Sequence, residues 1–382
     1  KLIGGTSIIM VAIGIVRYGA ASWLNPDKSS SWKNHLGVIS VGVGFVGIAI
    51  YLILLSMFSY WCCDISCPVR SDQLTVDLSR IIVWFIITLV LSLIFGMQYG
   101  FLNYTSLHRL YTDRLVRAYL GASNPRRHED PGMNVTEFVE NDDCPMIDYR
   151  PAESGGPFHI INTTFNETVS GQSQLEQRDW KGLPLAISGH AISIGVSHHT
   201  FFSGKSHSLE ITLEPIPIDE PKRFHIFHRE VIAEALGLGD WVSISGAAVS
   251  TGMGSKTSLG LSLILAFLNI RLGYWWDSGI NPETRPNLYK PKNTGKCIGN
   301  MGRLFTRFFS VQSYLLDEFL ARFHGPARRY WYLTDGGHFE NTGVYELIRR
   351  RLPLIIALDN GADPGYSFQD LGALIRRARI DF

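Results

Sequence analysis

The stretch "YLTDGGHFENTG", Tyr332 to Gly343, ends an apolar run with a carboxylate that leads directly into two glycines. Glycine lets the backbone bend sharply and leaves space for a ligand or another loop beside Asp335. A carboxylate with an ordinary pKa of about 4 is a weak base, but burial against the apolar run would raise the pKa of Asp335. We therefore expect Asp335 to accept a proton, with Gly336 and Gly337 shaping its turn. Because Asp-Gly-Gly is also common turn chemistry, the pattern alone leaves a structural role open.

Strand-like and helix-like segments alternate around this stretch. The residue types indicate a strand over 328–337, a helix over 344–351, a buried strand with a turn over 352–364 and a helix over 368–382. This order predicts an α/β fold with a parallel sheet covered on both faces. Active residues of such folds gather at the carboxyl ends of strands, where we expect Asp335 and Asp359.

Further elements are predicted upstream. Residues 107–121 place apolar side chains at helical spacing with basic residues between them, which predicts an amphipathic helix that docks on the globular part. Residues 122–156, with Asn, Pro, Asp and Gly throughout, predict an irregular connection. The remaining predicted elements are strands over 157–166, 183–189 and 208–218 and helices over 231–238 and 257–276.

Charged residues are sparse in the first part of the chain. Residues 1–102 hold ten of the 35 basic and 34 acidic residues, and the runs 37–63 and 81–102 hold none. Each of these two runs is long enough to cross the roughly 30 Å hydrocarbon layer of a bilayer as a helix. We predict that both are transmembrane, with 2–24 as a third candidate that Arg17 weakens. A buried apolar helix is the alternative.

The basic residues predict an orientation for such a protein. With three spans, the loop that carries Lys28 and Lys33 lies on the same side of the membrane as everything after residue 102. The positive-inside bias then places the larger C-terminal part in the cytoplasm. The basic residues after the last span that support this orientation are Arg109, Arg114, Arg117, Arg126 and Arg127.

The serines of a second glycine-rich stretch, "WVSISGAAVSTGMGSK" (241–256), do not fit a nucleophile elbow. That turn requires G-x-S-x-G, but Ser245 lacks both glycines, and Ser250 and Ser193 lack the first. These hydroxyls are expected to cap helices or satisfy turns. The five cysteines and twelve histidines offer no set at ligand spacing, so no metal or cofactor is predicted. A formal net charge of +1 gives no indication of a nucleic-acid partner.

Several motifs together resemble bacterial patatin-like phospholipases, relatives of the cytosolic phospholipase A2 catalytic domain. The similar segments are "YLTDGGHFENTGVYELIRRR", "LIIALDNGADP", "FQDLGALIRRARIDF", "SISGAAVSTGMG", "LNIRLGYW", "TDRLVRAYLGAS" and "GPFHIINTTFN". They span about residues 107–382 and occur in the expected order. The resemblance implies the C-terminal part of a patatin-like parallel-sheet hydrolase domain over 157–382. It would follow a membrane region over 1–102 and a connection over 103–156.

The resemblance also implies a mechanism. A serine attacks the ester, an aspartate removes its proton without help from a histidine, and a glycine-rich loop stabilises the oxyanion. The family's G-x-S-x-G serine is expected upstream of Lys1, so residues 1–382 alone are not expected to hydrolyse esters. By this resemblance Asp335 is the dyad aspartate, Gly336, Gly337, His338, Glu340 and Asn341 complete its motif, and Ser245, Gly246, Ala247 and Ala248 line the pocket.

Two hypotheses of different classes follow. The first is a lipid acyl hydrolase anchored in the bacterial inner membrane, which takes its substrate from the bilayer. The second is a catalytically silent membrane scaffold that keeps the fold without the chemistry. The residues leave open which lipid ester would be cut, whether calcium is needed and what the oligomeric state is.

Overall fold

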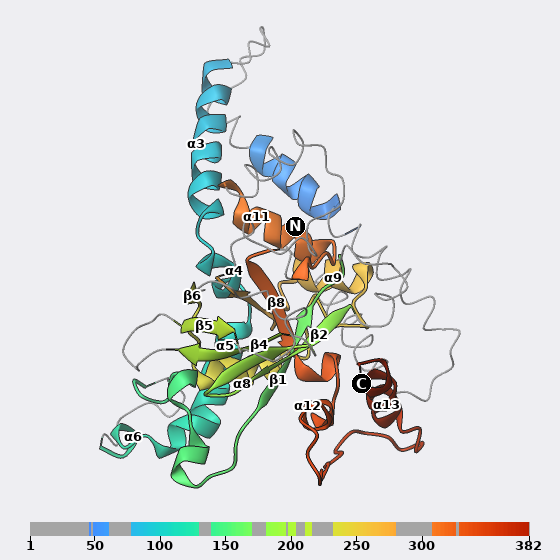
Figure 1. Cartoon of the computed structure of the whole chain (residues 1–382). Coiled ribbons are helices and arrows are strands. Elements are labelled where there is room, and N and C mark those ends of the chain that lie inside the picture. Colours follow the sequence, from blue (N-terminus) through green and yellow to red (C-terminus); the bar gives the residue numbers. More distant parts are fainter. Residues whose placement is uncertain are drawn as a thin grey trace.

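The structure is a computed structural model of the 382-residue chain. It describes residues 46, 49–60, 78–129, 139–169, 181–195, 198–203, 211–215, 232–279, 308–325 and 328–381. These residues place a β-sheet between helices, with a long helix extending away from one end of the molecule (Figure 1). The candidate site lies at the end of the sheet strand that carries Asp335.

The sheet is antiparallel, with its strands in the order β6-β5-β4-β3-β2-β1-β8-β7. Strand β1 lies between β2 and β8, and its Thr163 is the register partner of Asp335 at the end of β8. The strands are β1 (Ile161–Asn166), β2 (Gly182–Ile187), β3 (Ala191–Ile194), β4 (His198–Ser203), β5 (Ile211–Pro215), β6 (Ile232–Ala233), β7 (Tyr274–Asp277) and β8 (Tyr330–Asp335).

The predicted parallel sheet is therefore wrong. Connections of three residues join β2 to β3 and β3 to β4, and connections this short make neighbouring strands antiparallel. The parallel arrangement also required residues 352–364 to form a strand, but these residues join no strand of the described sheet. Leu354, Ile356 and Leu358 are 75%, 78% and 80% exposed, and Asp359 is exposed beside them. Asp359 therefore does not lie at a strand end.

Helices cover both faces of the sheet. On one face, Trp241 of α8 packs edge-to-face on Trp276, with ring centroids 5.6 Å apart. On the other, Tyr314 of α11 packs on Trp275, with centroids 4.8 Å apart. Because side chains alternate along a strand, these two consecutive tryptophans serve opposite faces. The α-helices labelled in the structure are α3 (Leu78–Gly96), α4 (Gly100–Tyr104), α5 (His108–Leu115), α6 (Arg126–Glu129), α8 (Leu238–Ser245), α9 (Leu259–Phe267), α11 (Ser310–Phe319), α12 (Val344–Arg349) and α13 (Gln369–Asp381).

The prediction of transmembrane helices, and of the inner-membrane location that depends on them, is contradicted over the described residues. In the part of the chain that the structure describes, no helix combines the length and the apolar content that a membrane crossing requires. The predicted span 81–102 is divided, since α3 ends at Gly96 and a second helix begins at Gly100. Leu102 belongs to the globular core, where it is 1% exposed in one cluster with Trp275. Residues 2–24 lie outside the described residues, as does most of 37–63.

Several other predicted elements are confirmed. Strands β1, β5 and β8 and helices α12 and α13 lie within their predicted ranges, and β2 begins one residue before its own. The amphipathic segment 107–121 forms α5 and a π-helical turn, Val116–Leu120. It packs on α8, where the hydroxyls of Thr112 and Ser243 are 2.7 Å apart. The predicted helix over 231–238 is wrong, because β6 occupies its first part and α8 begins at Leu238.

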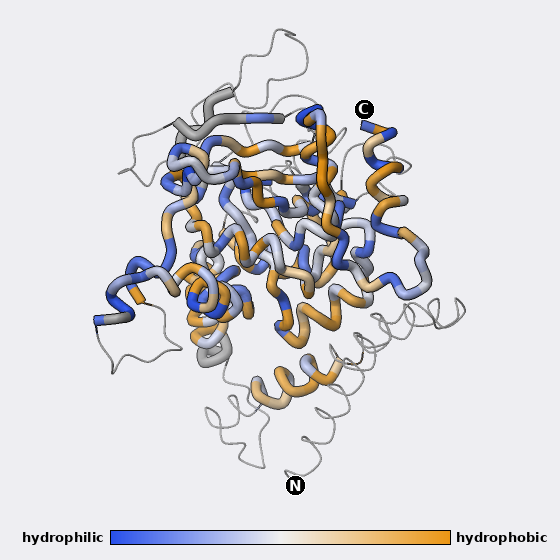
Figure 2. The backbone as a smooth tube through the Cα atoms, turned by 90° about the horizontal axis from the view of Figure 1, so that it is seen from below, coloured by the Kyte–Doolittle hydropathy of each residue, from blue (hydrophilic) through white to orange (hydrophobic). Residues whose placement is uncertain are grey.

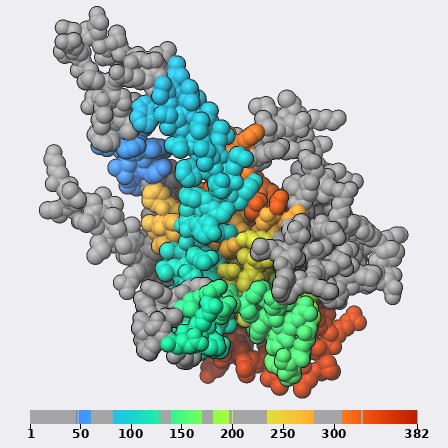
Figure 3. Space-filling view, turned by 90° about the vertical axis from the view of Figure 1, so that its left-hand side faces the viewer, coloured from blue at the N-terminus to red at the C-terminus, as the bar shows by residue number. Residues whose placement is uncertain are grey.

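Figures 1 and 3 show α3 at the end of the molecule opposite α12 and α13. The turns of α13 alternate between hydrophilic and hydrophobic residues (Figure 2). Its buried Leu374 packs with Phe339, Val344 and Tyr345, a cluster that includes the start of α12. The segment around Asp335 is thus held between the sheet and a small C-terminal core.

Candidate functional site

Asp335 is the last residue of β8, and a 3-10 turn over Gly336–His338 follows it. The carboxylate oxygen Oδ1 accepts a hydrogen bond from the Gly337 backbone N–H at 2.7 Å. The carbonyl oxygen of Asp335 accepts one from the Thr164 hydroxyl of β1, also at 2.7 Å. Both contacts fix the carboxylate at the point where the chain leaves the sheet.

Both glycines of the Asp-Gly-Gly turn lie close to neighbouring atoms. A Cβ atom on Gly336 would lie 2.5 Å from the backbone oxygen of Asn162, and real Cβ contacts are not that short. A Cβ atom on Gly337 would lie 2.6 Å from Asn341 Oδ1 and 3.1 Å from Asp335 Oδ1. The close approach of β1 explains the glycine at position 336, and the side chains of Asn341 and Asp335 leave little space at position 337.

A pocket of about 470 Å³ opens beside this turn. Asp335 lines it together with the residues before and at the start of β1, the end of α8 and the loop 340–343. Asn162 of β1 and Ser245 of α8 both line it, and the Ser245 hydroxyl donates to the Asn162 carbonyl oxygen at 2.8 Å. The structure therefore joins the Asp-Gly-Gly turn to the glycine-rich stretch about 90 residues before it in the sequence.

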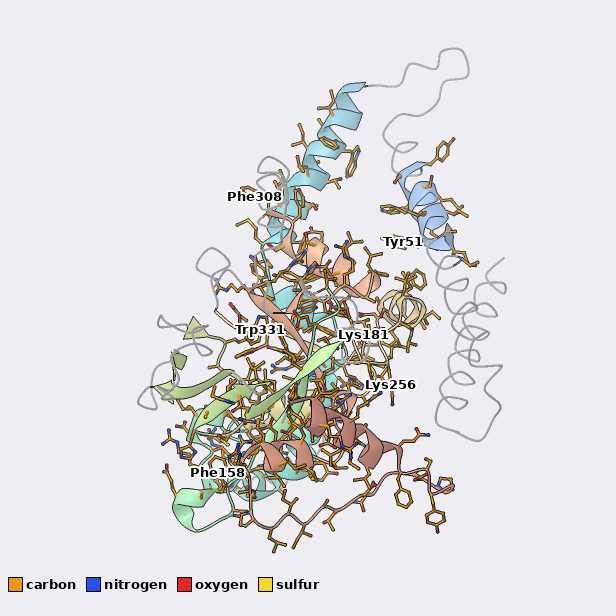
Figure 4. All side chains as sticks on the ribbon, turned by 45° about the vertical axis from the view of Figure 1, so that its right-hand side comes forward. Tyr51, Phe158, Lys181, Lys256, Phe308 and Trp331 are labelled. Carbon is orange, nitrogen blue, oxygen red and sulfur yellow. The ribbon has the colours of Figure 1, made fainter. Side chains whose placement is uncertain are left out.

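Burial raises the pKa of the Asp335 carboxyl, while the Gly337 N–H and the positive charge of Lys256 oppose that rise. Lys181 anchors the loop that carries Lys256, since its Nζ donates to the Thr257 carbonyl oxygen at 2.7 Å. Figure 4 shows both lysines on the same side of the molecule. The raised pKa agrees with the expectation that this carboxylate is a better base than an exposed one.

The four residues of the predicted pocket-lining segment differ in position. Ser245 lines the pocket, and the carbonyl oxygen of Gly246 accepts a hydrogen bond from the Tyr111 hydroxyl at 3.3 Å. Ala247 is completely buried. Ala248 is exposed, and its carbonyl oxygen is 3.1 Å from His338 Nε2. The structure thus places one of the four, Ser245, in the pocket wall.

His338 is a buried connection between the turn and that segment. Because the Ala248 carbonyl can only accept, Nε2 carries the proton, and Nδ1 accepts from the Thr334 hydroxyl at 3.0 Å. Burial, the largest cause, lowers the pKa of His338 to about 4. Asn166 extends the network by donating from Nδ2 to the Thr334 hydroxyl oxygen at 2.9 Å. A neutral histidine in this position holds the pocket wall to the sheet.

Glu340 and Asn341 have different roles. The carboxylate of Glu340 accepts hydrogen bonds from Thr342 N, Thr342 Oγ1 and Tyr345 N at 2.5, 2.6 and 3.2 Å, which fixes the loop before α12. Asn341 lines the pocket and donates from Nδ2 to Asp370 of α13 at 2.9 Å. Both residues therefore also stabilise the loop that closes one side of the pocket.

Sequence reasoning missed Asn162 and Tyr111. Asn162 lines the pocket, and among the described residues its Oδ1 is buried without a hydrogen-bond partner. Tyr111 of α5 has a raised pKa, caused first by burial and then by the negative charge of Asp335. The position of Asn162 within a predicted strand was the available signal. No sequence signal pointed to Tyr111 beyond its place on the amphipathic helix.

The other two candidate serines have structural roles. Ser250 is completely buried and donates to the carbonyl oxygen of Ala247 at 2.9 Å. Ser193 is 7% exposed within β3 and is the register partner of Ala186 in β2. Neither is among the residues that line the pocket.

Comparisons with known protein families, with curated proteins and with solved structures give no match for this chain. The resemblance to patatin-like phospholipases is therefore carried by the sequence motifs alone. What it implies about activity enters below as a proposal.

Proposed function

We propose that the pocket beside Asp335 is the acid–base part of a lipid acyl hydrolase. The observation that carries this proposal is the position of Asp335, a carboxylate of raised pKa in the wall of a 470 Å³ pocket. Ile160, Ile161 and Val242 line the same pocket and offer an apolar surface to an acyl group. The match of Asp335 and its turn to the patatin-like motif supports the reaction class.

In the proposed reaction, Asp335 accepts the proton of a serine hydroxyl while the serine oxygen attacks the ester carbonyl. The tetrahedral intermediate then expels the alcohol, which takes the proton back from Asp335. Water, deprotonated by the same carboxylate, hydrolyses the acyl-serine and regenerates both groups. A carboxylate with a raised pKa suits both directions of transfer, because it binds the proton more firmly than an exposed aspartate does.

The identity of the attacking serine is the main choice within this proposal. Ser245 lines the pocket, but its hydroxyl hydrogen is donated to a backbone carbonyl, a contact that holds α8 to β1. We assign Ser245 to the pocket wall and expect the nucleophile to be another serine. Replacing Ser245 by alanine would then reduce turnover by less than about tenfold.

The test is ester hydrolysis by the natural full-length protein. We expect Asp335→Asn to lower kcat by about 10²- to 10⁴-fold, as the loss of a general base does. A fluorophosphonate should label one serine in the unsubstituted protein and label it far more slowly in the variant. Circular dichroism would show that the fold is kept.

Three results would decide against the proposal. If Asp335→Asn hydrolyses esters as fast as the unsubstituted protein, the carboxylate takes no part in the reaction. Labelling of Ser245 itself would replace the proposed nucleophile. Absence of both hydrolysis and labelling would favour the catalytically silent scaffold.

A further inference from the structure

The charges around the pocket indicate which esters it accepts. Two carboxylates, Asp335 and Glu340, are among its lining residues, whereas no lysine or arginine of the described chain is. Proteins bind phosphate groups chiefly through charge-assisted hydrogen bonds from arginine and lysine. A phosphodiester in this pocket would meet carboxylates and find no such donor in the wall.

Two cations act on these carboxylates from outside the wall. Burial raises the pKa of Asp335 and lowers that of Arg377, and in each case the opposite charge, Lys256 or Glu340, counters the shift. The Arg377 guanidinium lies 4.1 Å from the ring centroid of Phe339, and the arginine is 4% exposed. Neither cation is among the lining residues. Lys256 and Arg377 therefore partly offset the negative charge of the two carboxylates but offer no hydrogen bond to a ligand in the pocket.

The Asp335 and Asn162 side chains of the wall each carry an acceptor with few hydrogen bonds among the described residues. The Asp335 carboxylate has one hydrogen bond among the described residues, that from Gly337 N–H. The backbone carbonyl oxygen of Asn162 accepts a hydrogen bond from Ser245. The side-chain Oδ1 of Asn162 is buried and has no hydrogen-bond partner in the part of the chain that is described. A ligand that brings O–H groups satisfies such acceptors, whereas a phosphate brings only more acceptors.

We infer that the pocket takes an uncharged glycerol ester with free hydroxyl groups, such as a monoacylglycerol, in preference to an anionic phospholipid. The hydroxyls would face Asp335, and the acyl chain would lie against Ile160 and Val242. This inference rests on the proposed function for its assumption that the ligand is a lipid ester.

The test measures binding with ether lipids, which cannot be hydrolysed. A 1-alkylglycerol and the corresponding 1-alkylglycerol phosphate share the chain and the glycerol and differ only in the phosphate. Each would compete with a fluorescent monoacylglycerol for the natural full-length protein. We expect the neutral ether to bind at least about tenfold more tightly at low salt, and the difference to shrink at about 0.5 M salt, where charge repulsion is screened.

A positive charge introduced at the edge of the pocket tests whether charge decides between the two ether lipids. His159 is exposed, lines the pocket and contacts the Tyr149 hydroxyl at 3.1 Å. His159→Lys should tighten binding of the phosphate at least about fivefold and leave the neutral ether within about twofold. His159→Gln, which loses the same imidazole without adding charge, should leave the preference of the unsubstituted protein in place.

Equal or tighter binding of the phosphate by the unsubstituted protein would overturn the inference, as would a failure of the neutral ether to compete. These outcomes are separate from those for the reaction. A protein that prefers the neutral ether but hydrolyses no ester would refute the proposed function alone. A hydrolase that depends on Asp335 but prefers the phosphate would refute the inference alone.

Discussion

Asp335 and His338 are three residues apart, and burial shifts their pKa values in opposite directions. The pKa of the carboxyl rises and that of the imidazole falls to about 4, because burial disfavours the charged form of each. The aspartate faces a pocket, whereas both nitrogens of the histidine are engaged with Thr334 and Ala248. Only the aspartate is therefore placed to exchange a proton with a ligand.

His338 makes folding stability depend on pH. Its folded-state pKa is about 4, and an unfolded histidine takes up a proton near about 6.5, so its contribution is complete above that pH and is lost as the pH falls toward 4. Between pH 7 and pH 5 the unfolding free energy falls by about 2 kcal/mol because of His338. Asparagine does not titrate in this range. Between pH 7 and pH 5 we therefore expect the unfolding free energy of His338→Asn to fall by about 2 kcal/mol less than that of the unsubstituted protein. Urea unfolding at the two pH values measures it, and parallel pH profiles for the two proteins would contradict it.

The residues of the Asp-Gly-Gly motif can be identified from the sequence, but the contacts that each of them makes cannot. Asp335 and its two glycines are predictable because a glycine pair directly after an apolar run indicates a sharp turn at the end of a strand. The capping of the α12 loop by Glu340 and the connection made by His338 depend on Tyr345, Thr334 and Ala248 being brought close by the fold. Sequence spacing does not contain that information.

At the scale of elements, the β1 strand and the turn after β8 are packed against each other. We expect Gly336→Ala to destabilise the protein by about 1–3 kcal/mol, the usual cost of overpacking, because its Cβ atom would overlap the Asn162 carbonyl. The unfolding free energy in urea measures this effect.

Gly372 in α13 is the matched control for that substitution. A Cβ atom there meets nothing within 4 Å, and alanine favours helix over glycine by about 1 kcal/mol. Gly372→Ala should therefore leave the protein as stable as before or more so. Equal destabilisation by both substitutions would show that the contact with β1 does not matter.

The existence of many elements is easier to predict from the sequence than their arrangement. Residues 330–335 and 344–349 form the expected strand and helix, since apolar runs and helical spacing act locally. The sheet is antiparallel, and residues 352–364, apolar enough for a buried strand, lie outside it. Local composition cannot show whether a neighbouring strand is present to pair with such a segment.

At the scale of the whole molecule, a buried ion pair joins parts that are far apart in the chain. Arg271 and Glu318 form it, and their side chains are 4% and 1% exposed. Glu318 also accepts from the Trp275 indole at 2.6 Å, and the Arg271 guanidinium donates to the Leu102 carbonyl at 3.1 Å. The pair thus connects α4, which contains Leu102, with β7 and α11.

Removing one partner of this pair should destabilise the whole fold. We expect Glu318→Ala to cost about 3–5 kcal/mol, because it leaves the Arg271 charge buried and unpaired. Chemical denaturation measures the loss. Glu140→Ala is the control, since Glu140 pairs with Arg126 at the surface and such pairs contribute about 0–1 kcal/mol. Similar losses in the two variants would mean that the buried pair does not hold these parts together.

The uncovered segment 352–364 has a consequence for how the protein behaves in concentrated solution. Its exposed Leu354, Ile356 and Leu358 lie on a backbone that pairs with no described strand, which is the arrangement that recruits further chains edge to edge. Self-association, seen as light scattering that grows with protein concentration, should therefore begin at this segment while the pocket is still intact.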